Sequence, residues 1–254
     1  MNVLLIAHNT FRETVRDRIL VGLVVCGLVV LGLTRVAAPL AMGEDLRLTV
    51  DLGLSSITWL GLLIVLMVGA SLVGKEIDRK IIFNLLSRPL PRPFYLVGKW
   101  AGLTGTLLAF ALLLGAALAL EVTVLGHAAM LPSLAQALYL IGLELAIVTS
   151  IAVMFSALST PVLSALYTLG LFLAGQWCDD LRRFALDAPG SLRPMLETAA
   201  NLLPNLPLFN MRTLASAGEL TTPAHLVIAT VYAGLYCGCV LLLGSAAFES
   251  RDFK

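Results

Sequence analysis

The sequence has 254 residues, of which 59% are hydrophobic and only 13% are charged. These proportions exclude a soluble domain and indicate an integral membrane protein. The net charge of +1 gives no sign of a nucleic-acid partner, and none is expected.

Residues 1–18 are predicted to form a helix that lies in the membrane surface. Apolar residues such as Leu4, Phe11 and Val15 recur at helical spacing on one side, while most charged residues fall on the other. The alternative is the first part of a signal peptide. We favour the interfacial helix, because the charged part is long and the apolar run that follows exceeds a signal-peptide core.

Six apolar stretches are then judged against the roughly 20 residues that a helix needs to cross a bilayer, and the fifth is short. We expect an all-α membrane protein with a single transmembrane domain, 1–254. Spans 1–2 fall within 19–73, spans 3–5 within 100–177 and span 6 within 225–248. The expected spans are Ile19–Met42, Leu52–Val73, Trp100–Val124, Leu134–Leu158, Pro161–Trp177 and His225–Phe248.

The segment 74–99 is the longest polar interruption in the first two-thirds of the chain. Ile77, Ile81 and Leu85 recur at helical spacing, which predicts a short amphipathic helix. Pro89 and the two prolines that follow it end this helix, since proline lacks the amide donor. A rigid turn and a new helix are expected after it.

The lysines and arginines predict the orientation of the spans. Eleven of them lie in the two termini and in the segment 74–99, and five lie in the loops on the opposite side. Both termini and the segment 74–99 are therefore expected in the cytoplasm, for a multi-pass protein of the inner (plasma) membrane.

The external segment 178–222 is not a plain loop. Apolar residues recur at helical spacing from Leu192 to Leu203, and two prolines then precede a second short helix around Phe209–Ala217. We interpret this segment as a broken or partly re-entrant helical pair that dips towards the outer leaflet. An amphipathic surface hairpin with only a packing role is the alternative.

Glu144 is the one acidic residue near the middle of a span, roughly 15 Å deep at 1.5 Å per residue. A carboxylate at that depth is costly, so it should face protein or a wet cavity. Glu144 is a candidate for the transport pathway, and the alternative is an interhelical hydrogen bond to a threonine or serine. Arg35 and Glu121 lie towards the outer ends of their spans and could pair or snorkel.

The chain lacks the motifs of an ATPase and of a protease. Neither of its two Gly-Lys pairs, at Gly74 and Gly98, ends a P-loop. No HExxH motif occurs, and a membrane serine such as Ser71 has no histidine at a span centre to act as its base. The four cysteines form no CxxC pair. We expect no enzymatic activity, no catalytic or metal site and no cofactor bound by this chain.

The segment 74–99 resembles the cytosolic loop of ABC-2 type transporter permeases. The resemblance rests on the order of a glutamate, a Leu-Leu-Ser run, a proline, an arginine and a closing Gly-Lys pair. Many members of this family carry Gly-Thr after the glutamate, where this chain has Lys80 and Ile81. Further matches are IAHNTFRETVRDRIL near the start, PNLPLFNMR before the last span and SRDF near the end. The subgroup it resembles includes permeases that assist copper-site maturation of nitrous oxide reductase.

The resemblance implies the membrane subunit of an ATP-driven exporter. Its partners would be an ABC ATPase subunit, which uses ATP and Mg, a second permease subunit (the same or a related chain) and membrane lipid. The loop 74–99 would hold the coupling helix, and the external segment an outer gate. The cargo remains open among drugs, lipids, ions and sulfur species, and a non-transporting membrane scaffold or assembly subunit is the alternative function. The implied ATPase-coupling residues are Glu76, Ile77, Ile81, Leu85, Leu86, Pro89 and Arg92.

Overall fold

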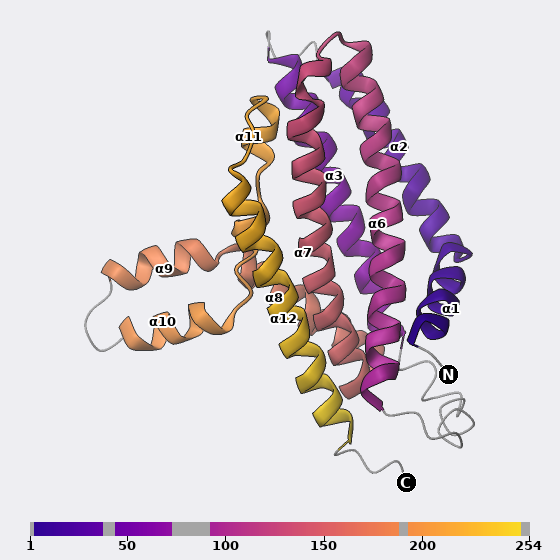
Figure 1. The fold of residues 1–254 in the computed structure, drawn as a ribbon, viewed down its shortest axis with the longest axis vertical. Coiled ribbons are helices and arrows are strands. Elements are labelled where there is room, and N and C mark those ends of the chain that lie inside the picture. Colours follow the sequence, from indigo (N-terminus) through magenta and orange to yellow (C-terminus); the bar gives the residue numbers. More distant parts are fainter. Residues whose placement is uncertain (1–2, 38–43, 73–91, 188–192, 250–254) are drawn as a thin grey trace.

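A computed structural model of the chain describes residues 3–37, 44–72, 92–187 and 193–249, and every regular element within these ranges is a helix. The helices form an elongated bundle, from which one helical pair projects sideways (Figure 1). The α-helices are α1 (Val3–Val15), α2 (Arg18–Ala37), α3 (Asp45–Met67), α6 (Arg92–Val124), α7 (Leu131–Leu158), α8 (Pro161–Gln176), α9 (Cys178–Asp187), α10 (Arg193–Leu202), α11 (Arg212–Ser216) and α12 (Pro223–Glu249), with short 3-10 turns η2 (Gly69–Ser71), η3 (Ala128–Met130) and η4 (Leu206–Phe209).

Five helices of the described ranges are long and apolar enough to cross a membrane: α2, α3 with η2, α6, α7 with η3, and α12. A sixth candidate is the pair α8 and α9, which is bent by 52° at their junction. The expectation of an all-α, multi-pass membrane protein is therefore confirmed. The predicted fifth span matches α8, whose 16 residues cover roughly 24 Å and fall short of the hydrocarbon core of about 30 Å.

Helix α7 is the centre of the bundle, because α3, α6, α8 and α12 all pack against it. Its most apolar window is 67% buried inside the protein, compared with 22% for α2 at the periphery. The side chains of Leu140, Ile147 and Val148 on α7 are fully enclosed. Most of this helix is thus enclosed by protein, whereas Tyr139, which is 46% exposed, lies at its surface.

The N-terminal helix α1 lies along the start of α6. Its buried residues are Ile6, Thr10 and Thr14, whereas Leu4 of the expected apolar stripe remains 79% exposed. The contact is close: a Cβ atom added at Gly102 of α6 would stand 2.5 Å from a backbone oxygen of α1. Ile6 and the two threonines of α1 therefore pack against small residues of α6, which let the helix backbones approach, while Leu4 faces outwards.

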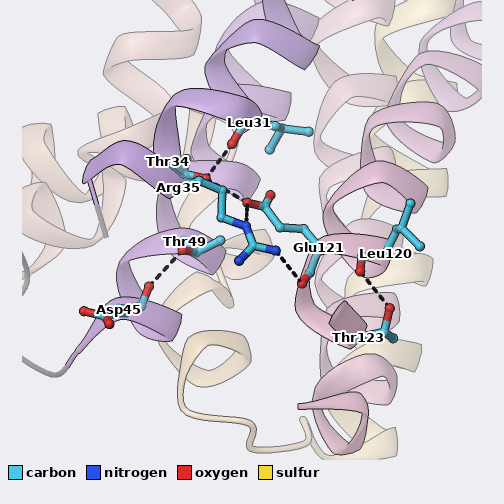
Figure 2. A network of polar contacts seen from close by, with 8 residues as sticks. All are labelled: Leu31, Thr34, Arg35, Asp45, Thr49, Leu120, Glu121 and Thr123. Carbon is cyan, nitrogen blue, oxygen red and sulfur yellow. Dashed lines mark hydrogen bonds and ion pairs between the residues drawn. The ribbon is translucent and has the colours of Figure 1, made fainter. Parts of the chain in front are cut away.

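An ion pair joins α2 to α6 (Figure 2). It lies near the end of the two helices that the charge pattern predicts to be outside the cytoplasm. Arg35 Nε lies 2.7 Å from Glu121 Oε1, and the guanidinium also donates to the backbone oxygen of Glu121. Thr34 Oγ1 donates to the same carboxylate at 3.4 Å. Of the two sequence-based alternatives, pairing is therefore the one found.

The external segment contains three helices and one 3-10 turn in its described part. Helices α9 and α10 pack on each other and leave the bundle sideways (Figure 1). The thiol of Cys178 donates to the backbone oxygen of Ala200 and joins the two helices. Helix α10 and the short helix α11 match the two predicted helices, and α9 is an additional helix that the sequence analysis did not predict.

Most of the proposed coupling residues lie outside the described residues. These are Glu76, Ile77, Ile81, Leu85, Leu86 and Pro89. The remaining one, Arg92, is the first residue of α6.

Candidate functional site

Glu144 lies inside the bundle, on the central helix α7. Only 1% of the residue is exposed, and its Oε1 accepts a hydrogen bond of 2.6 Å from Nε2 of Gln176. Gln176 is the last residue of α8. The interhelical partner of the carboxylate is thus an amide, where the sequence analysis expected threonine or serine.

Arg212 brings a positive charge to this carboxylate. It is the first residue of α11. It lies in residues 203–216, which return to the bundle after α10 and which we call the returning segment, and its charge acts on Glu144. Its Nη1 donates to Oγ of Ser55 on α3 at 3.3 Å. Its Nε is buried and has no hydrogen-bond partner among the described residues. We call Ser55, Glu144, Gln176 and Arg212 together the polar junction.

The returning segment is held in place by backbone contacts on both sides of η4. The amide of Asn205 donates to the hydroxyl of Tyr232, and His225 Nε2 lies 2.9 Å from the backbone oxygen of Leu208. Leu206 and Phe209 are fully buried. Irregular backbone is tolerated at membrane depth only where protein covers it, and these contacts supply that cover.

Helix α8 ends where the returning segment passes. A Cβ atom added at Gly175, one residue before Gln176, would stand 2.8 Å from the backbone oxygen of Pro204. The absence of a side chain at this position lets the returning segment lie directly against the last turn of α8. The amide of Gln176 and the guanidinium of Arg212 thereby reach the same part of the bundle.

An aromatic pair joins α3 to α8, the helices that carry Ser55 and Gln176. Trp59 on α3 meets Phe172 on α8 edge to face, with ring centroids 5.9 Å apart, and Phe172 is buried. A buried charge is costly to leave without a partner. Removing one member of a buried pair costs about 3–5 kcal/mol. The junction therefore links α3, α7, α8 and α11 in a single electrostatic unit.

The chemistry of the junction is that of binding and switching. Within the described ranges, no group of three or more histidines, cysteines or acidic residues could hold a metal ion. A buried carboxylate, an amide and a guanidinium can exchange partners with each other or hold a polar group that passes between them. Such a set suits a barrier that opens and closes.

Sequence reasoning identified Glu144 and missed the other three members. Arg212 was counted with the charges of an external loop, although it ends the apolar run PNLPLFNMR, whose composition is that of a buried segment. Gln176 closes the fifth expected span without any charge that marks it. The pathway role of Glu144 stays a prediction.

The chain matches no model of a known protein family, and it matches no protein of established function. Its function must therefore be argued from the arrangement of its residues and from the sequence motifs described above.

Proposed function

We propose that this chain is the transmembrane permease subunit of an ATP-driven ABC-2 type exporter. It works as a pair of permease subunits with separate ATPase subunits, which bind ATP and Mg. The observation that carries the proposal is the return of the chain into the bundle after α10, which seats Arg212 near Glu144. A loop that only connects two spans needs no arginine held against the bundle, whereas an outer gate needs contacts that hold its closed state.

The proposed topology has six crossings, with the bent pair of α8 and α9 as the fifth. Helix α1 and the last turns of α12 lie towards the same end of the bundle, as an even number of crossings requires (Figure 1). The charge pattern supports an orientation with that end in the cytoplasm, and the proposed location is the inner (plasma) membrane. The segment 74–99 then faces the ATPase.

The proposed mechanism transmits force from the segment 74–99 to the polar junction. Helix α3 precedes this segment and helix α6 begins within it, at Arg92, and both pack against α7. Ser55 on α3 holds the guanidinium of Arg212. A shift of α3 on ATP binding would therefore move one partner of the lock and leave Glu144 on α7 in place. Cargo would pass when the returning segment is released.

The apolar face of the expected coupling helix provides the test. Ile77→Ser/Leu85→Ser removes roughly 1.5–3 kcal/mol of burial per side chain, if this face enters a groove of the ATPase. Two such losses weaken the contact at least about a hundredfold, at 1.4 kcal/mol per factor of ten. We expect the ATPase to be lost when the chain is purified from membranes that contain both subunits.

The matched control is Arg79→Ser, which lies on the side of the expected helix opposite Ile77, Ile81 and Leu85. We expect it to retain the ATPase, and both variants to insert normally. If the double variant keeps the ATPase and coupled transport, the coupling assignment is wrong and the scaffold function is the better account.

A further inference from the structure

A buried lysine lies near the start of α6 and takes no part in the polar junction. Lys99 is only 5% exposed, although lysine is almost never buried unless it is paired. It follows Arg92, where α6 begins, by roughly 10 Å at 1.5 Å per residue. The members of the polar junction lie on α3, α7, α8 and α11, so Lys99 is a separate feature of the molecule.

The ammonium group of Lys99 lies beside an aromatic ring. Its Nζ is 5.8 Å from the centre of the ring of Tyr95, which lies one helical turn earlier. A cation within about 6 Å of a ring centre is attracted to the negative face of the ring. Tyr95 belongs to a buried cluster that consists of Ile6 of α1, Tyr95 and Leu96 of α6, Val153 and Ala157 of α7 and Leu241 of α12. Lys99 thus places a positive charge where these four helices meet.

The residues on either side of Lys99 hold this part of α6 between two other helices. A Cβ atom added at Gly98 would stand 2.8 Å from Cβ of Ile6 on α1. The indole of Trp100 donates to the backbone oxygen of Ala146 on α7 at 3.0 Å. The backbone at Lys99 is therefore fixed on both sides, and its side chain has little freedom to turn towards water.

Packing alone does not account for a lysine at this position. An ammonium group is costly to take out of water, and apolar residues of similar volume often replace buried ions without loss of stability. The best-attested use of a buried polar or charged group is to fix one register between packed helices, because apolar contacts are non-directional. A buried charge between α1, α6, α7 and α12 is therefore expected to specify how these helices are aligned.

Lys99 is also the last residue of the segment 74–99, which the proposed function assigns to the contact with the ATPase. Movement of this segment can reach the bundle through α3, which precedes it, or through α6, which begins within it. The buried cluster joins the start of α6 to the last turns of α7, the helix that carries Glu144. If α6 and α7 keep one alignment, the movement passes to α3, where Ser55 holds Arg212.

We propose that Lys99 is a positioning residue that fixes the register of α6 against α7. Its positive charge holds the first turns of α6 at one level of the α7 surface. The register concerns the bundle alone, whereas its consequence for transport, the transfer of movement to α3, rests on the proposed function.

The register is measured in the full chain in lipid nanodiscs, from the distance between two spin labels. The labels are placed at Leu120 on α6 and at Thr160 just after α7, which are both exposed, and the exposed Cys26 and Cys239 are replaced by serine. We expect Lys99→Met to broaden the distribution of this distance at least about twofold, because apolar contacts remain while the charge is lost. Its Tm should equal or exceed that of the unmodified chain.

Two variants separate the effect of the charge from that of packing. Lys99→Arg keeps a cation that attracts the ring of Tyr95, and it should retain the narrow distribution. Leu96→Met changes a buried side chain of the same cluster without a change in charge, and it should retain the narrow distribution as well. The proposal is overturned if Lys99→Met gives a distribution as narrow as that of the unmodified chain. It is equally overturned if Lys99→Arg or Leu96→Met broadens the distribution as much as Lys99→Met does.

A second pair of labels, at the exposed Asp51 on α3 and at Thr160, tests the consequence for transport. ATP and Mg are added to the complex with the ATPase subunit. We expect this distance to shift in the unmodified chain, and the shifted population to fall at least about fivefold in Lys99→Met, as for a typical coupling between two sites. A shift of equal size in Lys99→Met overturns the role of Lys99 in coupling. If the unmodified chain shows no shift, the proposed function is wrong, while the distance between Leu120 and Thr160 still decides whether Lys99 fixes the register.

Discussion

Replacement of Arg212 by alanine tests whether the polar junction locks the returning segment. Arg212→Ala removes the cation near the buried carboxylate of Glu144 and the hydrogen bond of 3.3 Å to Ser55. Breaking a buried ion pair costs about 3–5 kcal/mol when one partner remains. The two charges here interact without a direct salt bridge, so we expect a smaller loss of about 2–3 kcal/mol.

Thermal melting of the detergent-purified chain provides the assay. A loss of 2–3 kcal/mol corresponds to a decrease in Tm of roughly 4–12 °C for a chain of this size. The double variant Arg212→Ala/Glu144→Gln should regain at least about 1 kcal/mol, because it leaves no unpaired buried charge. Arg193→Ala is the control, since Arg193 forms an exposed pair with Glu197 on α10 that is worth about 0.5 kcal/mol or less.

Two results would refute this reasoning. One is a decrease in Tm for Arg212→Ala that is no larger than that of the control. The other is a double variant that is less stable than Arg212→Ala alone, which would mean that Glu144 gains nothing from the positive charge of Arg212.

Three further predictions test other parts of the structure. Gly102→Leu should detach α1 from α6 and lower the Tm, because its side chain would meet the α1 backbone, while Gly22→Leu, which has open space, should not; equal Tm values would contradict the observed contact. A cysteine introduced near Asp78 should react with impermeant reagents only from the cytoplasm, and one near Glu197 only from outside, and the reverse pattern would overturn the orientation. Glu144→Gln should preserve the fold, since an amide keeps most of the hydrogen-bonding capacity, and should alter transport or its pH dependence; unchanged transport across pH would leave Glu144 a packing role alone.

The helices could be predicted from the sequence because their signals are local. The apolar run that ends at Val124, the proline that opens α8 at Pro161 and the run that begins near His225 each set a helix boundary to within a few residues. Helix α9 was not predicted, although Leu181, Phe184 and Ala185 recur at helical spacing; its buried residues are the small Cys178 and Ala185.

The contacts between helices could not be predicted, because they depend on tertiary packing. The apolar stripe of α1 predicted a helix that lies in the membrane surface, and it did not predict the contact with α6 through Ile6, Thr10 and Thr14. Hydrophobic periodicity shows which side of a helix avoids water. It does not show which side packs closely against another helix, because small residues pack best in such a contact. For the same reason the depth of Glu144 was predictable, while the identity of its partner Gln176 was not.

The position of the polar junction follows from the short length of α8. A helix of 16 residues cannot cross the hydrocarbon core alone, so its last turn ends inside the membrane and leaves terminal carbonyl groups there. The returning segment covers this end, and its own irregular backbone must also be enclosed by protein. Buried polar side chains are tolerable only where partners converge, and the end of α8 is where Gln176, Glu144 and Arg212 converge. Moving the returning segment would therefore expose backbone and charge together, which makes a partly open state costly and favours two discrete states, as a gate requires.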